Sequence, residues 1–265
     1  MKAPLSVRTL PSLAFQAWLT PPPLPEPARR RDIEVLGGFD HTYFGGVHGY
    51  EIGEGPLVVA MHGWGGRAAQ WGPMARHLAD KGYRVLVPQL PGHAGGPRTN
   101  IKEAAAVIRQ LLDEVGWPEM VLAHSFAAMV ARLVFAIEAP DRVVMVAPAL
   151  NVEDALDVFS DRLDLASWAS RGLRSRLRKW DPELWPVVSA LRPEQLPGAR
   201  VLIVHDPDDV ETPFARSAEL AAIRRDTSIV PVPGAGHSRI LSADATLRSV
   251  LDFVVDRSEV GHDAA

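Results

Sequence analysis

The chain has 265 residues, enough to bury one large hydrophobic core, and α/β folds of this length are often single domains. Its net charge of −4 gives no overall attraction to nucleic acid, which we do not expect as a partner. The absence of cysteine excludes thiol catalysis, thiolate metal sites and disulfides. No apolar run approaches the ~20 residues that span a bilayer. The nine histidines form no close ligand pair, so we expect no metal.

Residues 1–32 differ from the rest and are predicted to form an N-terminal arm, which leaves residues 33–265 as the main domain. Apolar side chains recur there at helical spacing, namely Leu10, Leu13, Ala14, Ala17 and Trp18. The prolines between positions 21 and 27 favour an extended, polyproline-like segment. A signal peptide needs a longer apolar core and a small-residue cleavage site, so we expect a cytoplasmic protein. We interpret the arm as packed on the domain surface, with peripheral contact to a membrane as the less favoured alternative.

From residue 33 onward, predicted strands and helices alternate. Strands are expected at 33–39, 47–52, 57–61, 84–88, 120–123, 143–147, 200–205 and 228–232. Helices are expected at 68–81, 100–115, 126–139, 213–224 and 240–255. This order predicts an α/β fold with a mostly parallel central sheet and helices on both faces.

The alternation lapses between residues 151 and 198, where three short amphipathic helices are predicted, the third beginning at Asp181-Pro182. Trp168, Trp180 and Trp185 concentrate aromatic surface in this insert, and residues 171–179 make it locally basic. We interpret the insert as a small helical lid in which the three tryptophans contact substrate. A solvated helix face is the alternative.

A serine stands at the sharpest predicted turn of the chain. The apolar run Met120–Ala123 passes through His124 and Ser125 directly into a helical pattern. A serine on a strand-to-helix turn is typical of the nucleophile elbow, Gly-x-Ser-x-Gly, although Ala123 and Ala127 replace both glycines here. The alternative is that Ser125 only caps the helix.

Two later strand ends carry the other residues that a serine nucleophile needs. Asp209 follows the strand at 200–205, and His237 follows the strand at 228–232. A serine hydroxyl needs a base to take its proton during attack, and histidine, with an ordinary pKa of ~6.5, suits that role near pH 7. A carboxylate orients the imidazole and stabilises the imidazolium. The order Ser, Asp, His is that of α/β-hydrolases.

From about residue 33 to the last helix, the chain resembles the α/β-hydrolase superfamily, in particular its serine esterases and lipases. The segment 62–66 is similar to the family's His-Gly oxyanion loop, and 90–93 is similar to its Leu-Pro-Gly-His turn. The resemblance implies that the backbone N–H groups of Trp64 and Phe126 form the oxyanion hole. Alignment of the family's acid loop on His205 and Pro213 selects Asp209 as the acid, with Asp208 and Asp154 as alternatives.

The resemblance implies a cofactor-independent carboxylesterase that cleaves a small-molecule ester through an acyl-enzyme on Ser125. Thioester hydrolysis and perhydrolysis would use the same residues. Members with an aspartate nucleophile are disfavoured because serine occupies the elbow. A hydrolase-fold protein that only binds a ligand or partner is the alternative from another class, because fold alone does not establish activity.

Overall fold

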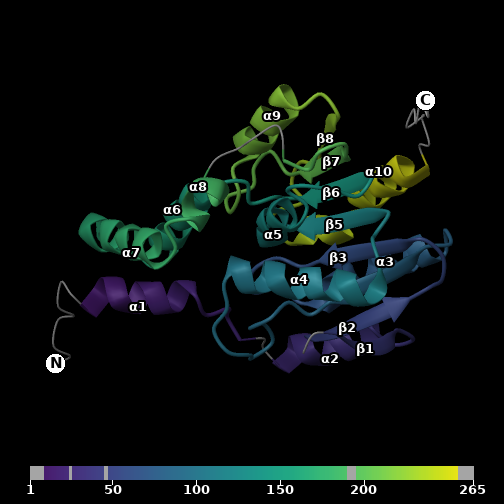
Figure 1. The fold of residues 1–265 in the computed structure, drawn as a ribbon, viewed down its shortest axis with the longest axis horizontal. Coiled ribbons are helices and arrows are strands. Elements are labelled where there is room, and N and C mark those ends of the chain that lie inside the picture. The colour runs from purple at the N-terminus through teal and green to yellow at the C-terminus, as the bar shows by residue number, and fades with distance from the viewer. Residues whose placement is uncertain (1–8, 24–25, 45–46, 190–194, 256–265) are drawn as a thin grey trace.

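The computed structural model describes residues 9–23, 26–44, 47–189 and 195–255, arranged as Figure 1 shows. These residues form an eight-stranded sheet in the order β1-β2-β4-β3-β5-β6-β7-β8. The strands are β1 (Asp40–Phe44), β2 (Val47–Ile52), β3 (Leu57–Met61), β4 (Arg84–Pro88), β5 (Met120–His124), β6 (Arg142–Val146), β7 (Arg200–His205) and β8 (Thr227–Pro231). Only the pairings of β2 with β1 and with β4 are antiparallel within this sheet. The predicted mostly parallel sheet is confirmed.

Helices cover both faces of the sheet. One face packs against α3 (Gly72–Ala79), α10 (Asp244–Val255) and the short helices η1 (Ala68–Trp71) and η2 (Arg239–Ser242). The other face packs against α4 (Ile101–Val115), α5 (Phe126–Val134) and α9 (Phe214–Ile223). Successive residues of a strand point to opposite faces, so Leu122 enters the first core and Ala123 the second. Two apolar faces explain why the central strands are apolar along their whole length.

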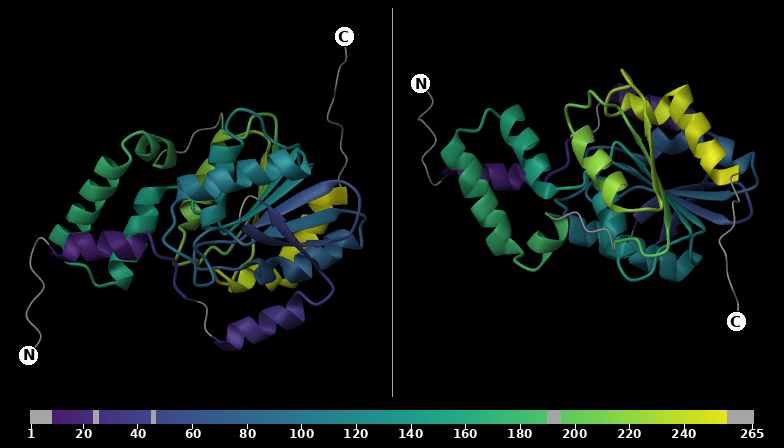
Figure 2. Two further views of the ribbon diagram at one scale, coloured as in Figure 1. Left: turned by 60° about the horizontal axis from the view of Figure 1, so that its bottom comes forward. Right: turned by 90° about the horizontal axis from the view of Figure 1, so that it is seen from above.

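The insert folds into α6 (Val152–Arg162), α7 (Ser167–Trp180) and α8 (Leu184–Val188), which lie at one end of the sheet (Figures 1 and 2). The N-terminal helix α1 (Thr9–Trp18) packs along α7 and shares its apolar cluster. At Gly172 the two helices approach closely, because a Cβ atom there would lie 2.7 Å from Pro11 Cγ. The arm therefore adds a fourth helix to the helical insert. None of the helices in the described residues is long and apolar enough to cross a membrane.

The strand predicted at residues 33–39 is wrong. Residues 33–35 belong to α2 (Glu26–Val35), which crosses the predicted boundary between arm and domain, and residues 36–39 form the turn that follows it. Pro27 falls in the first helical turn, where its missing N–H costs no hydrogen bond. Asp32 pairs with Arg67 at 2.6 Å and attaches α2 to the main domain.

Two predicted helix ends also differ from the structure. Helix α5 ends at Val134, short of the predicted position 139. The third helix of the insert begins at Leu184, whose N–H donates to the Asp181 carboxylate at 2.9 Å, so Asp181 and Pro182 stand before the helix.

Candidate active site

Ser125 sits in a strained backbone conformation between β5 and α5. Its φ of 52° and ψ of −118° lie where residues other than glycine are rarely found. The Ser125 N–H donates to Val146 O, and the Ala149 N–H donates to Ser125 O, both at 3.0 Å. The neighbouring strand β6 and the chain that follows it therefore hold the turn, and the conformation is that of a nucleophile elbow.

The two alanines that replace the elbow glycines leave Ser125 Oγ within hydrogen-bonding distance of His237 Nε2, at 2.9 Å. Ala123 and Ala127 are fully buried in the apolar cluster beneath α5. The tight approach is made instead at Gly63, where a Cβ atom would lie 2.8 Å from His124 Nδ1 and 3.0 Å from Ser125 Cβ. Glycine is required at that position because the loop formed by residues 62–66 passes directly over the turn at His124 and Ser125.

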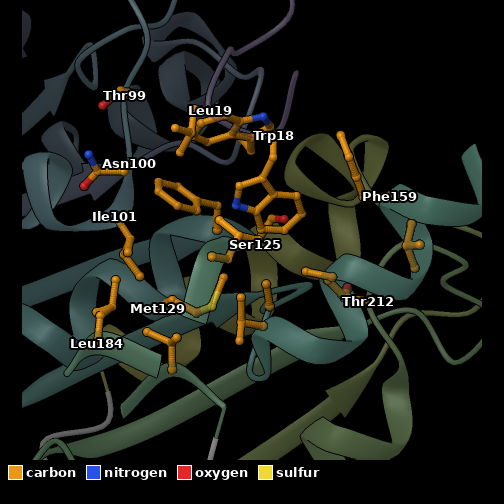
Figure 3. A pocket seen from close by; sticks show the side chains of 18 of the residues that line it. Trp18, Leu19, Thr99, Asn100, Ile101, Ser125, Met129, Phe159, Leu184 and Thr212 are labelled. Carbon is orange, nitrogen blue, oxygen red and sulfur yellow. The ribbon is translucent and has the colours of Figure 1, made fainter. Parts of the chain in front are cut away.

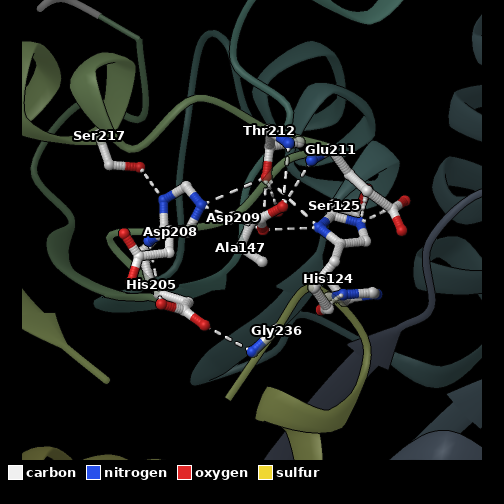
Figure 4. Close-up of polar contacts among 12 residues, drawn as sticks. His124, Ser125, Ala147, His205, Asp208, Asp209, Glu211, Thr212, Ser217 and Gly236 are labelled. Carbon is white, nitrogen blue, oxygen red and sulfur yellow. Dashed lines mark hydrogen bonds and ion pairs between the residues drawn. The ribbon is translucent and has the colours of Figure 1, made fainter. Parts of the chain in front are cut away.

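Ser125, His237 and Asp209 form one hydrogen-bonded chain, whose contacts are drawn as dashed lines in Figure 4. Ser125 Oγ lies 2.9 Å from His237 Nε2, and His237 Nδ1 lies 2.8 Å from Asp209 Oδ2. The Asp209 side chain is fully buried, and that of His237 is 9% exposed. An Nδ1–H donated to the carboxylate leaves Nε2 free to accept the serine proton.

The Asp209 carboxylate is surrounded by further donors. Its Oδ1 accepts the backbone N–H groups of Glu211 and Thr212, and its Oδ2 accepts the Thr212 hydroxyl at 3.0 Å. Burial acts to raise the pKa of Asp209, but hydrogen bonds from His205 and His237 outweigh it and hold that pKa well below its usual range. The acid is therefore a charged carboxylate at neutral pH.

His205 is a neighbour of Asp209 that the sequence analysis used only to align the loop. It lies at the end of β7, fully buried, with Nε2 at 3.3 Å from Asp209 Oδ2 and Nδ1 at 2.7 Å from Ser217 Oγ. Asp209 therefore stands between two histidines, of which only His237 also contacts Ser125 among the described residues (Figure 4). The spacing of four residues between His205 and Asp209 is the one sequence signal for this contact.

Three other aspartates, the alternatives Asp208 and Asp154 and the nearby Asp206, have different surroundings. Asp208 is exposed, and Asp154 of α6 pairs with Arg216 at 2.8 Å. Asp206 accepts the N–H groups of Gly234 at 3.2 Å and Gly236 at 2.6 Å, and these hydrogen bonds lower its pKa. Asp206 thus ties the loop that carries His237 to the loop that carries Asp209.

A buried histidine organises the loop that carries Trp64. His62 Nε2 accepts the Leu90 N–H at 3.0 Å, so its Nδ1–H donates to Gly63 O at 2.9 Å. The Gln89 amide nitrogen lies 2.9 Å from the same Nε2. Trp64 itself packs edge-on against Phe126, the first residue of α5, whose N–H has no partner within the helix.

A mostly apolar cavity of about 210 Å³ opens onto Ser125 and His237. Trp180 and Trp185, two of the three tryptophans predicted to contact substrate, line it together with Trp64 and Phe126, whereas Trp168 does not. Trp168 lies twelve residues before Trp180 on α7, about 18 Å along the axis and on another side of the helix. Helical spacing alone could not reveal which end of α7 reaches the cavity.

The N-terminal arm supplies lining residues that the sequence analysis missed. Figure 3 shows Trp18 and Leu19 on one side of the cavity, with Met129 and Leu184 on the other. Trp18 packs edge-on against Phe159 of α6 at 5.1 Å between ring centres. No group of His, Asp and Glu side chains that could hold a metal ion occurs within the described ranges.

Comparison with known proteins agrees with this fold. The sequence profile of the alpha/beta hydrolase fold family matches residues 56–168. A meta-cleavage product hydrolase from Pseudomonas fluorescens superposes with a TM-score of 0.59 and 21% identity over 81% of this chain and 97% of its own. The chain has the α/β-hydrolase fold. An esterase from Exiguobacterium antarcticum also superposes, with a TM-score of 0.57 and 18% identity, over 81% of this chain and 98% of its own.

Among curated sequences, this hydrolase-fold chain resembles enzymes with several activities. It is 30% identical over 97 residues to the pimeloyl-[acyl-carrier protein] methyl ester esterase of Vibrio campbellii, a match that spans 37% of each chain. It is 22% identical to the 2-hydroxy-6-oxo-6-phenylhexa-2,4-dienoate hydrolase of Burkholderia cepacia over 79% of this chain and 91% of that enzyme. The first two curated relatives are matched over little more than a third of their length, 37% and 35%.

We expect acid to destabilise the fold through His62 and His124. Burial lowers the pKa of each from 6.5 to about 3. Between these values the unfolded chain binds protons that the folded chain does not, so the free energy of unfolding falls as the pH drops through that window. Denaturant titrations from about pH 7 to about pH 4 should show this slope, and His124→Asn should flatten it. Equal slopes for wild type, His62→Asn and His124→Asn would contradict the assignment.

Proposed function

We propose that this protein is a serine hydrolase that cleaves carboxylic esters through an acyl-enzyme. The observation that carries the proposal is the hydrogen-bonded chain from Ser125 through His237 to Asp209. Ser125 and His237, at one end of this chain, line an apolar cavity. A serine that only capped α5 would accept a helix N–H, whereas Ser125 makes no such side-chain cap. The curated relatives that are esterases act on the same class of bond.

Each of the three residues has one part in the proposed reaction. Ser125 Oγ attacks the ester carbonyl carbon while its proton passes to His237 Nε2, and Asp209 stabilises the imidazolium that results. When the tetrahedral intermediate collapses, the C–O bond to the alcohol breaks and the same proton passes from Nε2 to the departing oxygen. Water then attacks the acyl-enzyme by the same route and releases the acid and free Ser125.

The backbone N–H groups of Trp64 and Phe126 are the proposed oxyanion hole. Both residues line the cavity beside Ser125, and Phe126 begins α5, where helix N–H groups favour negative charge. The hydrogen bonds of His62 hold the loop that carries Trp64, so that donor is positioned before substrate arrives. A preorganised donor of this kind contributes roughly 10²–10³ in rate.

Replacement of the nucleophile is the direct test. Ser125→Ala should abolish both hydrolysis of short p-nitrophenyl esters and labelling by a fluorophosphonate, with the circular dichroism spectrum and melting temperature retained. Ser249→Ala, on the outer helix α10, should leave both signals intact because its hydroxyl bonds only to Ala245 O among the described residues. Peptide mass analysis should place the label on Ser125. Wild-type turnover by folded Ser125→Ala would refute Ser125 as the nucleophile. A wild-type protein that neither hydrolyses these esters nor takes the label would support a protein that only binds its ligand.

The acid can be assigned with two neighbouring substitutions. Asp209→Asn should lower kcat by several orders of magnitude, since loss of the carboxylate leaves the wrong tautomer of His237, which costs about 10⁴ in serine proteases. Asp208→Asn should cost less than about twofold, because the Asp208 side chain is exposed and does not touch His237. Steady-state kinetics on one ester measures both. The opposite ranking would move the acid to Asp208.

Selection of acyl chain length should depend on the aromatic walls of the cavity. Trp18→Ala, Trp180→Ala and Trp185→Ala should shift the preferred chain length in a p-nitrophenyl ester series, because all three line the cavity. Removing an interaction that stabilises the ground state and the transition state equally raises KM and leaves kcat nearly unchanged. Trp168→Ala is the matched control on the same lid and should keep the wild-type profile. A profile that shifts only in Trp168→Ala would refute this description of the cavity.

A further inference from the structure

A second carboxylate, Glu211, lies beside His237 on the side opposite Asp209. Glu211 Oε2 is 3.6 Å from His237 Nε2, the nitrogen that also contacts Ser125 Oγ, whereas Asp209 contacts Nδ1. Figure 4 shows the Glu211 side chain reaching the edge of the imidazole. Its backbone N–H donates to Asp209 Oδ1 at 2.7 Å, so the same loop positions both carboxylates.

Lid residue Arg162 holds the Glu211 side chain. Arg162 Nη2 lies 2.9 Å from Glu211 Oε1, which leaves Oε2 directed toward His237, and both residues line the cavity. The other carboxylate in the cavity lining, Asp181, is paired with Lys102 at 2.7 Å. Each of the two carboxylates in the lining therefore has a cationic partner, and most of the remaining surface is apolar.

The position of Glu211 corresponds to the alcohol side of a bound ester. His237 Nε2 must deliver a proton to the departing alcohol oxygen, which requires that oxygen to come within about 2.6–3.2 Å of Nε2. A group on the second carbon of the alcohol, counted from the ester oxygen, then lies within reach of Glu211 Oε2. A hydroxyl there can donate a hydrogen bond to the carboxylate, while a methyl group leaves this oxygen without a partner from the substrate.

We propose that Glu211 determines specificity for the alcohol part of the substrate and selects esters of diols or polyols whose free hydroxyl neighbours the ester oxygen. The apolar cavity takes the acyl group, and Arg162 keeps Glu211 in the position that reaches the hydroxyl. This inference rests on the proposed ester hydrolysis at Ser125. It adds a residue that touches the leaving group to the three that carry out the acyl transfer.

Two esters that differ in one group test the inference. 2-Hydroxyethyl butyrate and propyl butyrate have the same acyl group, and the alcohol of one carries OH where the other carries CH₃. A hydrogen bond to a charged acceptor favours the hydroxyl ester by tenfold or more, and since Glu211 is one-third exposed we expect about tenfold in kcat/KM. Comparing this ratio between variants cancels the intrinsic reactivities of the two esters and any general damage to catalysis.

Two variants of Glu211 and one control separate the outcomes. Glu211→Leu should reduce the ratio by about tenfold, and Glu211→Gln, which keeps a neutral acceptor, should give an intermediate ratio. Glu219→Leu, which removes an exposed carboxylate paired with Arg216 on α9, should keep the wild-type ratio. Fluorophosphonate labelling of Ser125 in each variant verifies that the site is folded.

An unchanged ratio in a labelled Glu211→Leu protein would overturn the inference and leave the proposed function in place. A wild-type preference for propyl butyrate would do the same. If wild type hydrolyses neither ester nor any p-nitrophenyl ester, and Ser125 is not labelled, the proposed function fails and the inference fails with it.

Discussion

The left-handed backbone of Ser125 is the constraint on which the rest of the site depends. A conformation with φ of 52° costs a residue other than glycine about 1–3 kcal/mol. Hydrogen bonds of Ser125 to Val146 and Ala149 oppose that cost, and they exist because β5 and β6 are paired along their length. The strained conformation of Ser125 is therefore maintained by the buried central strands β5 and β6. It directs the hydroxyl out of the sheet edge, toward the loops that follow β7 and β8.

Those two loops are held together by buried carboxylates. An ionised carboxylate is costly to bury unless charges or hydrogen bonds compensate for the water it loses. Asp209 is compensated by two histidines and Thr212, and Asp206 by backbone N–H groups of the loop that precedes His237. The loops can move apart only by leaving these charges unsatisfied. The proposed catalytic groups are thus preorganised before any substrate binds, which is the condition for electrostatic catalysis.

The helical layer over the cavity, which is the proposed lid, is built from two segments far apart in the sequence. Helix α1 lies along α7, and the edge-on pairs Trp18 with Phe159 and Phe15 with Trp180 join it to the insert. The cavity is therefore bounded by the sheet edge on one side and by this helical layer on the other. Under the proposed function, the sheet edge supplies the chemistry and the lid sets the size of the acyl group. Glu211 and Arg162 lie where the two parts meet.

From residue 47 onward the sequence by itself determined the order of strands and helices, and it placed Ser125, Asp209 and His237 each after a strand, because periodicity and turn residues are local signals. The short motif at residues 62–66 also indicated Trp64 as a candidate donor to the oxyanion hole. Only the tertiary structure decided that helix α1, and not Trp168, lines the cavity, and that His205 and Glu211 flank the proposed catalytic residues. An apolar stripe shows that a helix needs a partner but not which one, since that choice depends on contacts between distant segments.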